Sequence, residues 1–257
     1  MIQKSKDSIY NLVTRIRSIH ALKPFSIKNI IRTKFVKRSS LDQIQLRLYE
    51  SNLIATSATG SKSEYQQDLW ILAQTNRKRN GYFVEFGATN GLDGSNTWLL
   101  ESEFQWTGIL AEPARKYHAN LANNRTCIID HRAISNSSTV LVPFREREEG
   151  YLSSLLMNSK IEKNSIDYMV QTVSLLDLLI EHQAPKKIDY ISIDVEGHEL
   201  PILKEFFEKS DYTVDFFSIE HNWRDERSDI VELMAKNGYD FEYEHMSYRD
   251  YLFKKKK

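Results

Sequence analysis

The chain has 257 residues, of which 41% are hydrophobic and 11% aromatic. This length and composition allow one large domain with an appendage and exclude a disordered or collagen-like protein. Basic and acidic side chains both number 35, so no overall positive charge attracts nucleic acid and no such partner is expected.

The first forty residues differ from the rest of the chain in charge. They hold ten basic side chains against the single acid Asp7, so residues 41–257 have a net charge of −9. Apolar residues at helical spacing over 5–20, with basic residues between them, predict an amphipathic helix that ends before Pro24. We expect this helix to contact either a peripheral membrane surface or another part of the protein, in the main domain or a partner subunit.

Two more short helices are expected in the same region, over 26–36 and 41–50. Small polar residues over 51–63 are typical of a linker. The sequence therefore predicts a basic helical extension and linker over 1–63, followed by the main domain over 64–257.

In the main domain, helices and strands are expected to alternate. Strands are predicted at 82–86, 108–112, 126–130, 168–173, 189–194 and 213–220. Helices are predicted at 65–79, 95–103, 114–123, 174–182, 199–209 and 226–237, and extra strand or loop at 138–145 and 151–157. Two closing strands, 239–245 and 250–255, are joined by a short turn and must be antiparallel. This order predicts an α/β fold, with a mostly parallel sheet between helices and an antiparallel C-terminal hairpin.

The first strand of this domain leads into a glycine-containing loop. The strand ends in Glu85, and Gly87 and Gly91 follow in the bend before the next helix. The loop lacks the G-x-G-x-x-G pattern that cradles a dinucleotide. It suits a ligand with an amino-acid end, because Glu85 and backbone carbonyls can accept from an ammonium while backbone amides bind a carboxylate.

Acids also follow three later strands. Glu112 ends the second strand, where a carboxylate can accept hydrogen bonds from ribose hydroxyls. Asp194 and Glu196 follow a buried strand, and Glu220 and His221 end the next one. Because parallel strands present their carboxyl ends at one edge, these side chains predict a site that abstracts a proton or holds a metal.

These residues lie in stretches that resemble the FkbM family of S-adenosylmethionine-dependent methyltransferases. The resemblance covers about 65–255 and rests on QDLW (67–70), GYFVEFGATNG (81–91), SNTWLLE (95–101), WTGILAEP (106–113), TVSLLDLL (172–179), IDYISIDVEGHEL (188–200) and SIEHN (218–222). It implies a seven-stranded Rossmann-like (class I methyltransferase) sheet. It also implies S-adenosylmethionine as cofactor and a hydroxyl of a sugar or natural product as acceptor.

The resemblance further implies which residues contact the cofactor. The expected set comprises Glu85, Gly87, Ala88, Asn90, Gly91, Asn96, Glu112, Asp130, Ala133 and Asp194, with Asp130 and Ala133 beside the adenine. The basic extension lies outside the matching stretches and inherits nothing from the family.

For the chemistry, His221 is the first candidate for the base that deprotonates the acceptor hydroxyl, because a neutral imidazole is available near neutral pH. Asp194 is the second candidate, and Glu196 and Glu220 are expected to orient His221 or bind sugar hydroxyls. In an alternative route, Asp194, Glu220 and His221 hold a divalent metal that acidifies the hydroxyl. The acceptor, a small molecule or glycan, is expected among loops 92–97, 143–165 and 222–228.

Two other functions compete with O-methylation of a carbohydrate. One is an NAD-dependent nucleotide-sugar enzyme, and the other is a non-catalytic domain docked through its basic arm. The single cysteine, Cys127, and the lack of an apolar run long enough to span a membrane favour a cytoplasmic location. The acceptor and the oligomeric state are not determined by the sequence.

Overall fold

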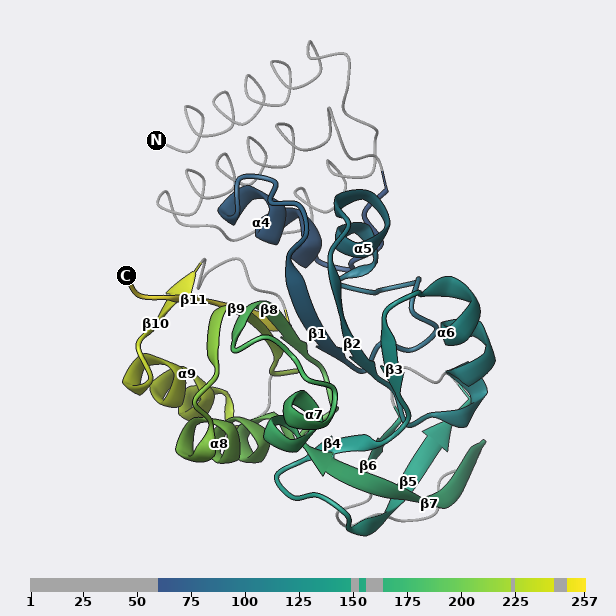
Figure 1. Ribbon diagram of the computed structural model, residues 1–257. Coiled ribbons are helices and arrows are strands. Elements are labelled where there is room, and N and C mark those ends of the chain that lie inside the picture. The colour runs from purple at the N-terminus through teal and green to yellow at the C-terminus, as the bar shows by residue number, and fades with distance from the viewer. Residues whose placement is uncertain (1–59, 149–152, 156–163, 223–224, 243–248) are drawn as a thin grey trace, which may run out of the picture. The chain divides into compact units, whose positions relative to one another are not determined.

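A computed structural model describes residues 60–148, 153–155, 164–222, 225–242 and 249–257 (Figure 1). The chain divides into two units, 1–59 and 60–257. The helices predicted over 5–20, 26–36 and 41–50 lie outside the described residues, as does most of the linker. The domain boundary at residue 63 therefore stays a prediction.

The main sheet has seven strands in the order β10-β11-β9-β8-β1-β2-β3. Strands β9, β8, β1, β2 and β3 pair in parallel, whereas β11 pairs antiparallel with both β9 and β10. The predicted mostly parallel sheet with an antiparallel C-terminal hairpin is confirmed. The bounds are β1 Tyr82–Phe86, β2 Thr107–Ala111, β3 Ile128–Asp130, β8 Lys187–Ile193, β9 Thr213–Glu220, β10 Tyr239–Glu242 and β11 Asp250–Lys255.

Helices cover both faces of this sheet, with α4 and α5 on one side and α7, α8 and α9 on the other (Figure 1). Helix α4 ends earlier than predicted, because Asn76 and Arg77 adopt left-handed backbone angles of 51° and 57° in φ. Ser174 caps α7 by accepting from the Asp177 amide at 3.1 Å. The bounds are α4 Gln67–Gln74, α5 Trp98–Phe104, η1 Arg115–Tyr117, α6 His118–Asn124, α7 Leu175–Glu181, α8 Glu199–Lys209 and α9 Arg227–Lys236.

A second, four-stranded sheet lies between β3 and α7 in the chain, in the order β4-β7-β5-β6. It consists of β4 Ala133–Ser135, β5 Leu141–Arg147, β6 Ser154–Leu155 and β7 Ser165–Ser174. The strand predicted at 168–173 belongs to this small sheet, and β4 was not predicted. One face of the small sheet buries Phe144 and Val170 against Ala114 and Ala133.

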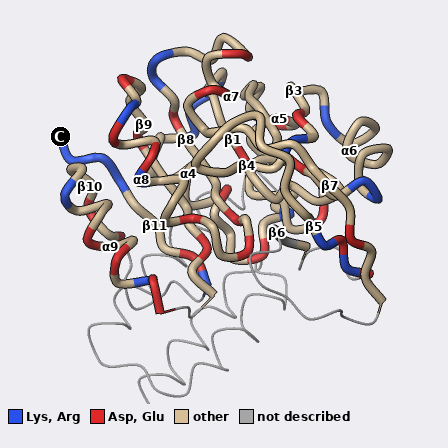
Figure 2. Tube along the Cα trace, turned by 90° about the horizontal axis from the view of Figure 1, so that it is seen from below, with Lys and Arg blue, Asp and Glu red and all other residues tan. Residues whose placement is uncertain are grey.

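The core follows from the apolar strands of the main sheet. Val84, Ile109, Ile191 and Phe217 are fully buried, as expected of parallel strands covered on both faces. Within the described ranges, none of the helices is long and apolar enough to cross a membrane. The chain ends in the four lysines of 254–257, which Figure 2 shows as an unbroken basic run at the C-terminus.

Candidate functional site

Gly87 makes a bend that brings three strand ends together. Its backbone is left-handed, with φ +72°, and its amide donates to the Ala111 carbonyl at the end of β2 at 3.1 Å. A Cβ atom at this position would lie 2.1 Å from the Asp194 carbonyl oxygen, just beyond β8. Only glycine therefore lets the end of β1 approach β8 this closely.

Glu112 follows β2 and is held by the glycine loop. Its two carboxylate oxygens accept from the amides of Thr89 and Ala114, both at 2.8 Å. Burial raises the pKa of Glu112 to about 7, against the lowering effect of these amides. Since a carboxylate offers about four lone-pair sites, the two amide bonds leave acceptor capacity for a ligand.

A cavity lies at the carboxyl ends of β1, β2 and β8. Apolar side chains from the small sheet, Phe144 and Leu155, form part of its wall, and carboxylates form another part. The lining residues are Phe86, Gly87, Thr89, Ala111, Glu112, Pro113, Ala133, Ile134, Phe144, Ser153, Leu155, Asp194, Val195 and Glu196. Five residues of the predicted site thus meet at one cavity: Gly87, Glu112, Ala133, Asp194 and Glu196.

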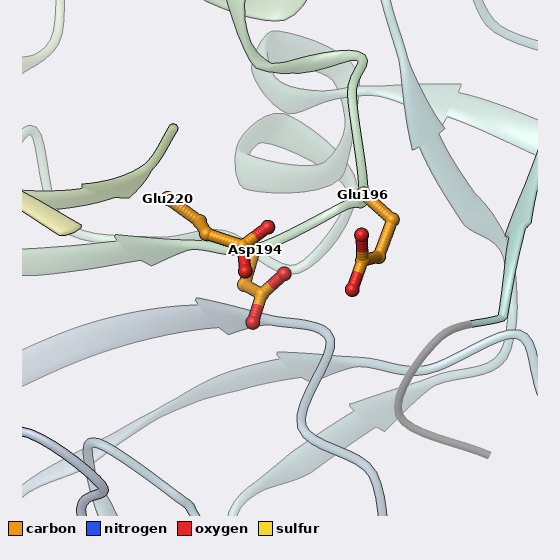
Figure 3. A group of neighbouring side chains, drawn as sticks. All are labelled: Asp194, Glu196 and Glu220. Carbon is orange, nitrogen blue, oxygen red and sulfur yellow. The ribbon is translucent and has the colours of Figure 1, made fainter. Parts of the chain in front are cut away.

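Three carboxylates gather where β8 and β9 end (Figure 3). Oxygens of Asp194, Glu196 and Glu220 lie within 4.8 Å of one another. The Asp194 and Glu220 carboxyl groups are hydrogen-bonded to each other. Burial and then the neighbouring carboxylates raise the pKa of Asp194 well above its usual value and that of Glu220 to about 8. We infer that the pair shares one proton near neutral pH, because two adjacent charges repel.

This group has two chemical uses. Once its shared proton has left, a carboxyl pair with a raised pKa is a stronger base than an ordinary carboxylate. Three converging carboxylates also suit a divalent cation, since such ions prefer oxygen ligands. Among the described residues, the group that could hold a metal contains Glu196 in place of His221. The predicted metal set of Asp194, Glu220 and His221 therefore needs this correction.

His221 lies beside the cavity wall rather than in it. The side chain is 2% exposed, and its ring stacks on Tyr251 with centroids 4.0 Å apart. Its amide donates to the Arg249 carbonyl at 2.8 Å, which ties the end of β9 to the start of β11. His221 is not among the lining residues, and its role as the base stays a prediction.

Glu85 is buried in a network of its own. Its oxygens accept from the Ser95 hydroxyl at 2.9 Å, the Thr97 hydroxyl at 2.5 Å and the Asn96 amide at 2.7 Å, and lie 3.5 Å from Arg125. The Asn96 side chain donates to the Ser192 hydroxyl on β8 at 2.9 Å. Glu85 and Asn96 thereby hold the loop before α5, and whether they also contact a ligand stays a prediction.

Four other predicted cofactor contacts lie outside the cavity lining. Asn90 accepts from the amides of the next turn, at Leu92 and Asp93, and Gly91 packs against Leu121 and Arg125. Ala88 is buried. Asp130 is also buried, and it accepts from Arg132 at 2.6 Å and from His182 at 3.0 Å. None of these four predicted residues appears among the lining residues.

Asp250 is a residue that the sequence analysis missed. It starts β11, directly opposite Glu220 in the antiparallel register, and its carboxylate accepts from Gln67. Burial raises its pKa to about 6, and its charge in turn raises the pKa of Asp194. The predicted strand over 250–255 was the signal for it, but the register between β11 and β9, which sets Asp250 opposite Glu220, was not predicted.

Residues 85–243, more than half of the chain, match the family described as Methyltransferase FkbM domain. No curated protein matches the chain.

Among solved structures, the chain is similar to a putative RNA methyltransferase from Pyrococcus horikoshii, with 12% identity, 74% of this chain and 81% of that chain covered, and a TM-score of 0.38. It is also similar to a precorrin-6y C5,15-methyltransferase from Geobacter metallireducens, with 9% identity, coverage of 77% and 94%, and a TM-score of 0.41. A human methyltransferase 10 domain containing protein shares 11% identity, with coverage of 86% and 99% and a TM-score of 0.40.

Proposed function

Because the chain belongs to the FkbM methyltransferase family, we propose that it transfers the methyl group of S-adenosylmethionine to a hydroxyl of a sugar or glycoconjugate. The observation that supports this proposal is the single cavity that joins Gly87, Glu112 and Asp194 from the ends of three parallel strands. In open α/β sheets, ligands bind in such a crevice.

The residues around the cavity fit this cofactor. Glu112 retains lone pairs for ribose hydroxyls beside the two amides that hold it. An apolar surface for the adenine ring is offered by Ala133, Ile134, Phe144 and Leu155. When bound, the cofactor supplies a methyl group on a positively charged sulfur.

The chain's own task is to position the acceptor hydroxyl and remove its proton. Correct alignment is worth roughly 7–11 kcal/mol in well-oriented reactions. We assign the proton to the Asp194–Glu220 pair, because Asp194 lines the cavity and the pair, once its shared proton has left, is a stronger base than an ordinary carboxylate. A positioned base contributes about 10²–10⁴-fold.

Cofactor binding is the first test. Isothermal titration with S-adenosylhomocysteine is expected to give a binding isotherm, whereas NAD is expected to give none. Binding of NAD alone would favour the nucleotide-sugar enzyme instead. Binding of neither compound would favour a non-catalytic domain docked through the basic arm.

The base is tested by two neighbouring variants. Glu220→Gln is expected to lower kcat by about 10²-fold or more while the dissociation constant for S-adenosylhomocysteine stays within about threefold. His221→Phe keeps a ring to stack on Tyr251 and is expected to lower kcat less than Glu220→Gln does. The opposite ranking would identify His221 as the base.

A chelator separates this route from a metal-dependent one. We expect EDTA to leave methyl transfer unchanged. If EDTA abolishes turnover and Mg²⁺ or Mn²⁺ restores it, the three carboxylates of Figure 3 hold a catalytic metal instead.

A further inference from the structure

We propose that Glu196 selects the acceptor by charge, favouring a hydroxyl compound that bears a protonated amine, such as an amino sugar, over one that bears a phosphate or carboxylate. This inference rests on the proposed function, because it takes the cavity beside Glu196 as the place where the acceptor binds.

The described wall of the cavity is acidic. Three of the lining residues are ionisable, and all three are acids: Glu112, Asp194 and Glu196. Over the described ranges, the lining contains no lysine, arginine or histidine. Glu220 adds a carboxyl group close to Asp194, and Asp250 adds another opposite Glu220 in the strand register. An anionic acceptor would therefore meet like charges in a partly buried space, where water screens them weakly.

Three arginines close to the lining residues in sequence contact groups outside the cavity wall. The Arg115 guanidinium lies 4.1 Å from the centre of the Tyr168 ring. Arg132 bonds Asp130 and Glu181, both at 2.6 Å. Arg145 pairs with Asp167 at 2.7 Å. Arg132 and Arg145 are adjacent in sequence to lining residues and Arg115 is two residues beyond one, yet each contacts a partner that is not part of the cavity wall.

Glu196 differs from Glu112 and Asp194 in how its carboxylate is held. Glu112 is held by two backbone amides, and Asp194 is bonded to Glu220. Glu196 reaches the group from the loop after β8, and its carboxylate points toward those of Asp194 and Glu220 in Figure 3. It is half-buried, its backbone has a left-handed φ of 58°, and the Asn222 side chain donates to it at 3.3 Å. Glu196 is thus held at the cavity, beside the pair that receives the proton.

The acidic wall and the position of Glu196 favour an acceptor that carries a positive charge. An ammonium is a compact cation with three donors, which a fixed carboxylate binds by a charge-assisted hydrogen bond. A phosphate brings acceptor oxygens and negative charge, and the described wall has no cationic side chain to pair with it. A neutral sugar is expected to rank between the two.

The charge of the natural product can be measured without knowing the acceptor. The full-length protein is incubated with methyl-tritiated S-adenosylmethionine and a small-molecule and glycan extract of the cells that carry the gene. The labelled product is then separated by ion exchange. We expect label in the cation-bound and neutral fractions. Label mainly in the anion-bound fraction would overturn the inference.

The same product tests the proposed function separately, because acid hydrolysis and sugar analysis show whether the labelled compound is a carbohydrate. A cationic product that is not a carbohydrate would contradict the proposed acceptor class and support charge selection. An anionic O-methyl sugar would support the acceptor class and contradict charge selection.

The role of Glu196 itself is tested with matched acceptors. Methyl glycosides of glucosamine, glucose and glucuronate compete for labelling of the extract, and inhibition constants are compared between the wild-type protein and Glu196→Gln. The wild-type protein is expected to bind the glucosamine glycoside about tenfold more tightly than the glucuronate glycoside, and Glu196→Gln is expected to remove that preference.

The exposed acid of α8 supplies the control, since Glu208→Gln makes the same charge change away from the cavity. We expect it to retain the wild-type preference. An unchanged preference in Glu196→Gln would contradict the assignment to Glu196, as would equal loss in both variants.

Discussion

Both β1 and β2 carry a glutamate at the carboxyl end of an apolar strand, Glu85 just before the last residue of β1 and Glu112 just after β2, but the two acids differ in their surroundings. Glu85 is enclosed with Arg125 and two hydroxyls, and it does not reach the cavity. Glu112 is bound by two backbone amides and lines the cavity. One carboxylate is therefore neutralised by a buried cation, whereas the other remains available at the ligand site.

The role of an acid at a strand end therefore depends on the groups around it, not on its position in the sequence alone. A buried carboxylate needs compensation, which comes from a paired cation or from hydrogen bonds. Arg125 is fully buried and also bonds Glu101 at 2.6 Å, so it needs both acids. Where such a cation is present, the glutamate stabilises the loop, and where it is absent, the glutamate can serve a ligand.

The largest expected effect comes from removing Glu85. Glu85→Ala leaves Arg125 short of a partner in a buried site, and breaking a buried pair costs about 3–5 kcal/mol. Denaturant unfolding is expected to show this loss as a lower midpoint. The double variant Glu85→Ala/Arg125→Met is expected to recover part of it. If Glu85→Ala instead keeps its stability and loses cofactor binding, Glu85 contacts the ligand as the sequence analysis suggested.

A smaller effect concerns pH and Glu112. Its pKa is raised from the usual 4.5 to about 7, so the folded chain holds this proton more tightly than the unfolded chain does. The free energy of unfolding therefore falls as pH rises from about 4.5 to about 7, by on the order of 3 kcal/mol from this group. Glu112→Gln is expected to reduce this change in the free energy of unfolding between about pH 4.5 and about pH 7. Parallel curves for the two proteins would contradict the raised pKa.

The smallest expected effect is on cofactor affinity. Glu112→Gln replaces a charged acceptor with a neutral one, and a hydrogen bond to a charged group contributes about 1.5–3 kcal/mol. Titration with S-adenosylhomocysteine at pH 8 is expected to show binding weakened by roughly ten- to a hundredfold. Glu103→Gln, an exposed change on α5, is the control and is expected to bind like the wild-type protein. Unchanged affinity in Glu112→Gln would remove the distinction between the two glutamates.

Much of the main sheet was predictable because its strands are short apolar runs between clear helices. The ranges predicted for β1, α8 and β9 match the observed bounds. The small sheet was harder to predict. Strand β4 has only three residues and was not predicted. Strand β5 mixes apolar and charged residues around Pro143, so the sequence indicated only strand or loop over 138–145.

Part of the site was also predictable. Gly87, Glu112 and Asp194 meet because parallel strands align their carboxyl ends, a rule that needs only the order of elements. Asp250 was missed, although its strand was predicted, because its position depends on the register between β11 and β9. Phe144 and Leu155 come from the small sheet, whose pairing no local pattern specified.

The sequence by itself determined the family, the alternation of helices and strands, and the edge of the sheet where acids gather, because these depend on local periodicity and chain order. Only the tertiary structure decided which acids share a proton, which one pairs with Arg125 and which wall the small sheet completes. Those outcomes depend on contacts between residues far apart in the chain, such as Glu85 with Arg125 and Asp194 with Glu220. The energy of a buried charge is set by such neighbours, and local sequence does not specify them.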